Sequence, residues 1–176
     1  MVYLFLADGF EEIEALACVD ILRRADIEIQ TVGVTGKNVL GAHGIKVEAD
    51  ILPSECETAE MLILPGGMVG TNNLKASEEV RKLIFEAYDG DKYLAAICAA
   101  PTVYGELGLL KGKRAVCYPG LEDGLEGALS SDDMVCVDGR FITSKGPGTT
   151  AEFALTIVEL LEGKATADAL RKGMLW

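Results

Sequence analysis

The sequence has one histidine, no C-x-x-C pair and no apolar run long enough to cross a bilayer. A metal centre built from cysteine and histidine needs clustered ligands, so we expect no dedicated metal site. The apolar opening, residues 2–7, is too short for a signal peptide and runs directly into acidic residues. We therefore expect a cytoplasmic protein that makes no contact with membranes.

Positive charge is also scarce. The chain carries 28 acidic and 16 basic side chains, which gives a formal net charge of −12. Such a surface repels nucleic acids and anionic lipid headgroups, so neither is an expected partner. The length of 176 residues suits one hydrophobic core. We expect a single domain over residues 1–176.

Disulfides are not expected, because the five cysteines are odd in number and widely separated. Cys18 falls on a helical apolar stripe, while Cys117 and Cys136 fall in apolar runs, so these three are predicted to be core residues. Cys56 lies in a polar loop and is predicted to be an exposed thiol. Cys98 remains as the cysteine with a chemically distinctive position.

Short apolar runs alternate with helical patterns along the chain. The predicted strands are residues 2–7, 27–34, 61–65, 93–98 and 114–118. Helical periodicity covers residues 10–25, 77–89, 100–109, 149–162 and 165–172. This alternation predicts an α/β fold with a mainly parallel sheet and helices on both faces.

Local signals refine this pattern. Ser77 is a predicted helix N-cap, and Thr149 with Glu152 matches a capping box. An irregular strand or hairpin is predicted over residues 40–49. Asp138-Gly139, between two β-rich arms, predicts a second hairpin.

Open parallel sheets bind ligands beyond the carboxyl ends of their strands. Cys98 is predicted at such an end, on a sharp turn from strand to helix that exposes nucleophiles in other α/β enzymes. A helix N-terminus would lower the pKa of its thiol. A buried, inert cysteine is the alternative interpretation.

Glu14 is the second candidate. The first helix carries an apolar stripe that is expected to face the sheet, with Glu14 inside it and Glu12 outside it. The stripe consists of Phe10, Ile13, Ala17, Cys18, Ile21, Leu22 and Ala25. A buried carboxyl group with a raised pKa could donate a hydrogen bond to a Cys98 thiolate. A glutamate at the edge of the stripe that reaches solvent is the alternative.

Backbone amides and one imidazole complete the candidates. Gly66, Gly67 and Gly70 follow a predicted strand and could donate N–H groups to an oxyanion, although such clusters often mark only a tight turn. A Cys–His dyad would have to use His43. Because His43 lies in a glycine-flanked loop, a solvated or interface position is the favoured prediction.

Four segments together resemble one family across nearly the whole chain. They are L-A-D-G-F-E-E-I-E-A, L-P-G-G-M-V-G-T-N-N-L, A-A-I-C-A-A-P-T and T-S-K-G-P-G-T-T-A-E-F-A. They resemble the ThiJ/PfpI superfamily and, more narrowly, its DJ-one clade of Parkinsonism-associated deglycase-like proteins. The resemblance implies a flavodoxin-like three-layer sandwich, a homodimer and no cofactor.

The resemblance also implies roles for individual residues. Cys98 would be the reactive nucleophile, readily oxidised to sulfinate, and Glu14 would hydrogen-bond to it. The amides of Gly67 and Ala99 would form an anion pocket, and Arg24 would approach the site of the partner subunit.

The chain departs from its relatives at several of the matching positions, including Ala100 where a glycine is usual and Lys145 where an arginine is common. Tyr118 stands where many relatives carry a histidine, and Ala99 stands where the peptidase-like branch has one. The resemblance therefore favours a glutathione-independent glyoxalase or deglycase acting on α-oxoaldehydes or glycated proteins. A redox sensor or chaperone-like protein is the alternative, and a cysteine hydrolase or amidotransferase ranks last because it needs an imidazole.

Overall fold

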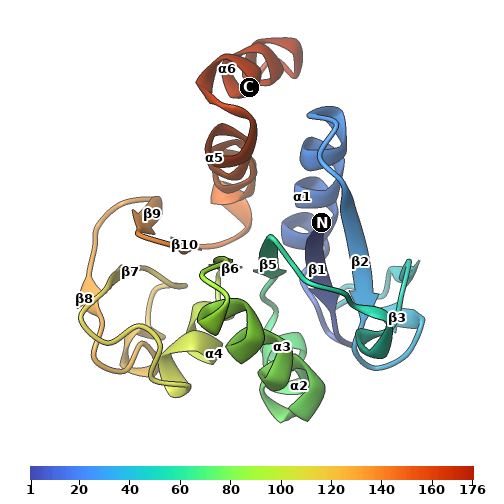
Figure 1. The fold of residues 1–176 in the computed structure, drawn as a ribbon, viewed down its shortest axis with the longest axis vertical. Helices are drawn as coiled ribbons and strands as arrows, with labels where there is room; N and C mark the ends of the chain where they lie inside the picture. The colour runs from blue at the N-terminus through green and yellow to red at the C-terminus, as the bar shows by residue number, and fades with distance from the viewer.

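Six strands form the central sheet of the computed structural model, which describes residues 1–176 (Figure 1). They are β1 (Val2–Leu6), β2 (Ile29–Gly33), β5 (Met61–Leu64), β6 (Tyr93–Ile97), β9 (Val135–Asp138) and β10 (Phe141–Ser144). Their order across the sheet is β2-β1-β5-β6-β10-β9. All neighbours pair in parallel except β9, which pairs antiparallel with β10 at one edge.

Helices cover both faces of this sheet (Figure 1). One face carries α1 (Glu12–Arg24) and α5 (Thr150–Glu162), with α6 (Lys164–Gly173) packed on α5. The other face carries α2 (Met68–Ala76), α3 (Glu78–Asp89) and α4 (Pro101–Glu106). This arrangement confirms the predicted three-layer α/β fold.

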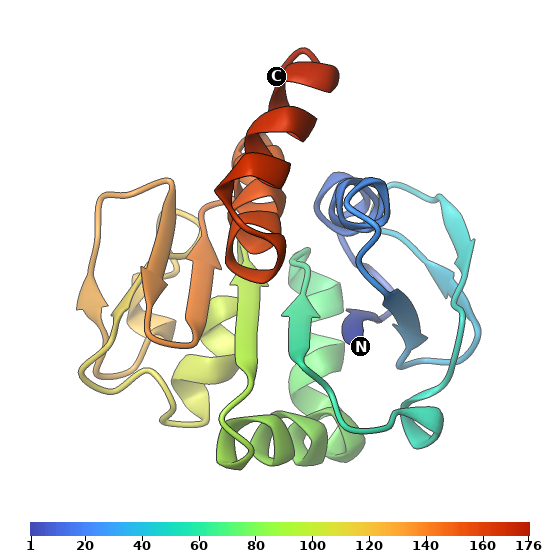
Figure 2. The same ribbon diagram turned by 45° about the horizontal axis from the view of Figure 1, so that its top comes forward.

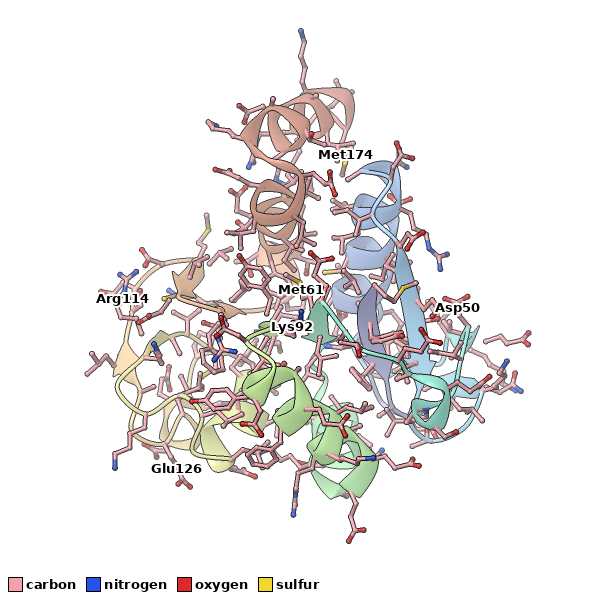
Figure 3. The ribbon with its side chains drawn as sticks, in the orientation of Figure 1. Asp50, Met61, Lys92, Arg114, Glu126 and Met174 are labelled. Carbon is pink, nitrogen blue, oxygen red and sulfur yellow. The ribbon has the colours of Figure 1, made fainter.

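Successive residues of the strands supply two separate cores. Within β1, Leu4 packs with the α1 and α5 layer, whereas Phe5 packs with the α2, α3 and α4 layer. Every residue of β1 is buried, because helices cover both faces. Met174, just beyond α6, packs against the first of these cores (Figure 3). No helix has the length and apolar character that crossing a membrane requires.

Two small sheets and three short 3₁₀ turns flank the central sheet. The strands β3 (Asn38–Leu40) and β4 (Lys46–Glu48) form an antiparallel hairpin beside β2, and β9 and β10 form another at the opposite edge (Figure 2). Both hairpins confirm the sequence-based predictions. The 3₁₀ turns are η1 (Pro53–Glu55), η2 (Glu122–Gly124) and η3 (Pro147–Thr149).

Two predicted elements were wrong. The strand expected over 114–118 is only β7 (Arg114–Ala115), which pairs with β8 (Leu129–Ser130) outside the central sheet. The sequence predicts a loop for the glycine-rich segment after β5, yet this segment forms α2 directly after Gly67. Gly70 and two asparagines give α2 a low intrinsic helix propensity, so packing against the rest of the fold determines its conformation.

Corrections also apply to the helix termini. Ser77 accepts a hydrogen bond from the Val80 amide, which confirms it as the N-cap of α3. The capping box at α5 does not form: the Thr149 hydroxyl bonds to Gly146 instead, and Glu152 binds Arg171 across 2.6 Å. The helix predicted over 100–109 ends three residues earlier, at Glu106.

The face that α1 turns to the core also differs from the prediction. Ile13 was expected to face the sheet, but it is 57% exposed. Glu12 was expected to face solvent, but it is buried by the β3–β4 hairpin loop. The apolar stripe is therefore shifted toward Ala15, Cys18 and Leu22, and Glu14 lies within it.

Candidate active site

The candidate site lies at the carboxyl ends of β1, β5 and β6, which are adjacent in the sheet. Cys98 directly follows β6 and has a φ of 66°, a left-handed conformation that is uncommon for a residue with a Cβ. Its amide donates to the Ser144 carbonyl across 2.9 Å, and its carbonyl accepts from the Tyr118 amide across 2.7 Å. These bonds hold the strained turn. The residue is half-buried.

The Glu14 carboxyl group faces this turn from α1 and is completely buried. Its Oε2 atom accepts a hydrogen bond of 2.7 Å from the Gly66 amide. Its Oε1 atom has no nitrogen or oxygen partner. The Cys98 thiol lies within hydrogen-bonding reach of the carboxyl group. The structure thus brings together the two residues that the sequence analysis ranked highest.

Gly66 permits this close approach. A Cβ atom on Gly66 would lie 2.6 Å from Cβ of Cys98 and 2.7 Å from Oε2 of Glu14. Such separations are far inside van der Waals contact, so any side chain here would push the acid and the thiol apart. Gly66 is therefore a spacer for the pair as well as a donor to the carboxyl group.

The amides of Gly67 and Ala99 both point to the Cys98 sulfur. Gly67 has a φ of 87°, and a Cβ there would lie 2.3 Å from the Gly9 carbonyl oxygen. The chain can therefore turn inward only with glycine at this position. Gly70 lies elsewhere: it is inside α2, and its amide donates to the Gly9 carbonyl. Gly70 is not free to bind an oxyanion.

Burial sets the electrostatics of the pair. It raises the pKa of Glu14 to about 7, against hydrogen bonds from Gly66 and Cys98 that lower it. Burial, followed by the charge of Glu14 and the hydrogen bond to it, raises the pKa of the Cys98 thiol to about 12, although the amides of Gly67 and Ala99 lower it. The sequence predicts a lowered pKa for the Cys98 thiol, and this prediction is wrong for the site with Glu14 ionised.

Two features account for the error. The helix after Cys98 is only the short α4, whose few peptide dipoles give a small field at its N-terminus. The sequence also could not reveal how closely the Glu14 charge approaches the sulfur. When Glu14 takes up a proton, that charge disappears, and burial alone opposes the two amides. The Cys98 thiolate is therefore less unfavourable opposite a protonated Glu14 than opposite an ionised one.

Two further acidic residues, Glu11 and Glu12, lie next to the site at the start of α1. Glu11 is the N-cap of α1: its Oε2 accepts from the Glu14 amide across 2.8 Å, and its own amide donates to the Gly66 carbonyl. Glu12 accepts hydrogen bonds from the backbone and the ring of His43, each 2.7 Å long. Neither role was predicted from the sequence. The run of acids before the first helix was the available signal.

His43 is tied to this network and not to the thiol. Its imidazole is 71% exposed, in agreement with the predicted solvated position. The hydrogen bond and charge of Glu12 raise the pKa of His43. Burial raises the pKa of Glu12, but hydrogen bonds from His43, together with backbone amides, outweigh it and lower that pKa. Ligand atoms of Glu11, Glu12 and His43 lie within 4.8 Å of one another. Both Glu12 oxygens, however, are already hydrogen-bonded to His43, so this group is organised as an ion pair.

The remaining candidates lie at different distances from the sulfur. Tyr118 adjoins Cys98 through its backbone and exposes its side chain. Arg24 lies ten residues beyond Glu14 on α1, about 15 Å along the helix, where it pairs with Asp20. It is therefore remote from the site of its own chain.

The other four cysteines take no part in the site. Cys18, Cys117 and Cys136 are buried, as predicted. Cys56 was predicted to be exposed but is half-buried, and it lines a cavity of about 400 Å³ beneath α3. Burial raises its pKa to about 11. Cys98 alone combines partial exposure with a buried acid and converging amides.

Comparison with known proteins identifies the family of this chain. A model of the DJ-1/PfpI family matches residues 1–160. The chain belongs to the DJ-1/PfpI family. Protein dj-1beta of Drosophila melanogaster is 38% identical over 97% of this chain and 94% of its own length. The oxidized DJ-1 structure of Toxoplasma gondii superposes with a TM-score of 0.95 at 35% identity, covering 99% of this chain and 97% of that one.

Two other relatives extend the comparison. The glutathione-independent glyoxalase DJR-1.2 of Caenorhabditis elegans is 34% identical over 92% of this chain and 88% of its own length. The DJ-1 homolog B of Arabidopsis thaliana is 38% identical over 97% of this chain. The chain spans only 40% of the length of that plant relative. The family therefore includes longer proteins as well as a glyoxalase.

Proposed function

We propose that this protein converts small α-oxoaldehydes, such as methylglyoxal, into 2-hydroxy acids without glutathione. One observation carries the proposal: a half-exposed thiol lies beside a buried carboxyl group whose pKa is raised to about 7. An acid with a pKa near the working pH can both accept and donate a proton during one turnover. The name of the Caenorhabditis elegans relative supports the same reaction class.

The reaction begins at sulfur. The Cys98 thiolate, opposite protonated Glu14, adds to the aldehyde carbon, and the Glu14 proton passes to the aldehyde oxygen. The product is a hemithioacetal beside an ionised Glu14. The amides of Gly67 and Ala99 stabilise the charge that develops on oxygen. Glu14 then moves the aldehyde-carbon proton to the neighbouring carbonyl carbon, which leaves a thioester next to a new hydroxyl group. Water cleaves the thioester and releases the 2-hydroxy acid and the thiol.

Lactate formation from methylglyoxal in the absence of glutathione tests the proposal. We expect Cys98→Ser to abolish activity, because serine is a far weaker nucleophile at this pH. We expect Glu14→Gln to lower kcat by about 10²–10⁴, the range for loss of a general acid–base group. Cys56→Ser is the matched control and should keep full activity. Lactate production that survives in Cys98→Ser would exclude the mechanism.

A redox sensor is the second candidate, and the same amides favour it. Peroxide would convert a Cys98 thiolate first to sulfenate and then to sulfinate, and the amides with Glu14 would hold the new oxygens. Intact-mass analysis after mild peroxide should find added oxygen on Cys98. Oxidation of Cys56 in place of Cys98 would contradict this role.

A cysteine hydrolase remains the third candidate and the weakest. That chemistry needs an imidazole to protonate the leaving group. His43 is hydrogen-bonded to Glu12, and no contact joins it to Cys98. Turnover of a peptide or glutamine substrate that is lost in His43→Ala would revive it.

We also propose that the protein works as a cytoplasmic homodimer. Exposed apolar side chains lie at the start of α1, on the β3–β4 hairpin and at the start of α2, and we call them the apolar patch. The patch consists of Ile13, Leu40, Ile45, Met68 and Val69. Apolar side chains gathered in this way favour association. A free thiol at the site fits a reducing compartment.

A further inference from the structure

Glu11 is tied to the candidate site by hydrogen bonds from both its backbone and its side chain. Its amide donates to the Gly66 carbonyl across 3.0 Å, and its Oε2 atom accepts from the Glu14 amide across 2.8 Å. The Gly66 amide in turn donates to Oε2 of Glu14 across 2.7 Å. These bonds join the three residues in one closed ring, so the position of the Glu14 carboxyl group depends on Glu11.

The negative charge of Glu11 lies where the fold stabilises it. Glu11 is the N-cap of α1, and the first N–H groups of a helix and its dipole favour a carboxylate there. Its side chain also keeps 11% of its surface exposed, whereas Glu14 is completely buried. Two carboxyl groups one helical turn apart oppose each other's ionisation, so a proton retained by the two acids belongs on Glu14.

The β3–β4 hairpin brings one positive charge toward Glu11. Nδ1 of His43 lies 4.0 Å from Oε1 of Glu11. The imidazole is 71% exposed and is hydrogen-bonded to Glu12 across 2.7 Å. Water screens a charge at such an exposed position, and the closer Glu12 carboxylate offsets most of it. His43 therefore does not neutralise Glu11.

The other helical neighbours of Glu14 are neutral or paired. One turn further along α1, Cys18 is a buried thiol whose pKa is raised by burial and by the charge of Glu14. On α5, which packs against α1, the acid of the first turn is Glu152, and it forms an ion pair with Arg171. Burial is the largest cause that raises the pKa of Glu14, and the charge of Glu11 adds to it.

We infer that Glu11 is a positioning residue of the proposed reaction, which fixes the Glu14 carboxyl group beside the Cys98 thiol and opposes its ionisation through a second charge. The inference rests on the proposed function and assigns a further residue to it. Before addition, the Glu11 charge keeps the proton on Glu14 while the sulfur is ionised. Once that proton has passed to the aldehyde oxygen, the same charge makes the Glu14 carboxylate a stronger base for the proton on carbon.

The pH dependence of Cys98 alkylation by iodoacetamide tests the inference without a substrate. In the wild type the rate should rise near pH 7, where Cys98 and Glu14 together lose one proton. Glu11→Gln keeps an oxygen that can accept the amide hydrogen bond and removes the charge. We expect the midpoint to fall by about half a pH unit and the plateau rate to fall about threefold, because an ionised Glu14 then competes better with the thiolate. An unchanged midpoint would overturn the inference.

A pair of shorter side chains separates charge from capping. Aspartate and asparagine are both strong N-cap residues of nearly equal size, and only aspartate carries a charge. Glu11→Asp should stay close to the wild-type midpoint, and Glu11→Asn should match Glu11→Gln. Both variants supply a favoured cap, so α1 should remain folded in each. Equal midpoints in the two variants would show that the charge of Glu11 has no effect on Glu14 and would overturn the inference.

Glu12→Gln is the matched control for a lost charge. Glu12 is the next residue of α1 and is also buried, but its carboxylate is hydrogen-bonded to His43 and has no contact with Glu14. The alkylation profile of Cys98 should therefore keep its wild-type midpoint. A shift as large as that of Glu11→Gln would assign the effect to the total charge at the start of α1 and overturn the specific role of Glu11.

Lactate formation from methylglyoxal connects the inference to the proposed function. In Glu11→Gln we expect kcat to fall about threefold to tenfold with little change in KM, and the acid limb of its pH profile to move to lower pH. Wild-type lactate formation with equal alkylation midpoints in the wild type and Glu11→Gln would overturn the inference and leave the proposed function intact. A shifted midpoint in a protein that forms no lactate would instead overturn the proposed function, and the electrostatic coupling of Glu11 to Glu14 would stand.

Discussion

The Cys98–Glu14 pair shares its protons, so neither residue titrates alone. Below pH 7 both groups hold a proton. Loss of the first proton leaves one proton for two sites, and the state with thiolate and carboxylic acid is the reactive one. The reactive fraction is then set by the balance between burial and the amides of Gly67 and Ala99.

We expect the rate of Cys98 alkylation by iodoacetamide to rise as the pH passes through about 7 and then to level off. This rise in rate near pH 7 reports the loss of one of the two protons held by Cys98 and Glu14. The sulfur can be ionised at neutral pH only after that proton has left the pair. Glu14→Gln removes the proton acceptor, so its rate should show no step near 7 and should rise only at higher pH. Mass spectrometry of the modified thiol measures both profiles.

Labelling of Cys56 supplies the internal control. Burial raises its pKa to about 11, so its alkylation should increase steadily over the same range in both proteins. Identical Cys98 profiles in the wild type and Glu14→Gln would show that the carboxyl group does not share the proton of the thiol.

Glu14 should also make stability depend on pH. Its pKa rises from 4.5 in the unfolded chain to about 7 in the folded one, so the folded state holds more protons between these values. The free energy of unfolding contributed by Glu14 therefore falls as the pH rises from 4.5 to 7, by about 3 kcal/mol. Glu14→Gln should be more stable than the wild type at pH 8, and the difference should shrink at pH 5. Urea unfolding at both pH values measures it, and an equal difference at both would contradict this account.

At the scale of elements, Glu12 joins α1 to the β3–β4 hairpin. Its carboxylate lies where a side chain on Gly41 would be, since a Cβ there would come within 2.3 Å of Oε1. The same oxygen accepts from the amide of His43. The hairpin loop therefore folds around a buried charge at the start of the helix that positions Glu14.

We expect Glu12→Gln to lower the pKa of His43 toward its ordinary value, because the hydrogen bond and charge of Glu12 hold it up. Hydrogen exchange of the amides at 41–45 should speed up in the same variant, since charge-assisted hydrogen bonds are lost. NMR titration is unambiguous here because the chain has one histidine. Glu48→Gln, on the exposed side of β4, should change neither quantity.

At the scale of the whole molecule, the apolar patch and the net charge act in opposite directions. A charge of −12 on each chain opposes association. Burial of Ile13 and its neighbours favours it. The proposed dimer requires that the apolar contribution outweigh the repulsion.

We expect the protein to sediment as a dimer at physiological salt, and Ile13→Asp to sediment as a monomer, because a carboxylate would be buried without a partner. Leu129→Asp is the matched control, since Leu129 is 58% exposed on β8 and outside the patch. Dissociation caused by Leu129→Asp and not by Ile13→Asp would place the interface elsewhere.

The sequence by itself determined the α/β architecture and the two principal candidates. Runs such as residues 2–7 are apolar at every position, which is possible only for strands covered on both faces. Cys98 at the end of such a strand, and Glu14 on the apolar face of a helix, follow from the same periodicity. These features are local, so a pattern of a few residues is enough to identify them.

Only the tertiary structure decided the details that govern the chemistry. Where the β3–β4 hairpin packs against α1 decides that Glu12 is buried and Ile13 is exposed. Similarly, α2 forms in a segment whose intrinsic helix propensity is low. The thiol pKa depends on the distance between two residues that are 84 positions apart in the chain. Electrostatic interactions and burial act through space, and their strength is fixed only when the fold brings such residues together.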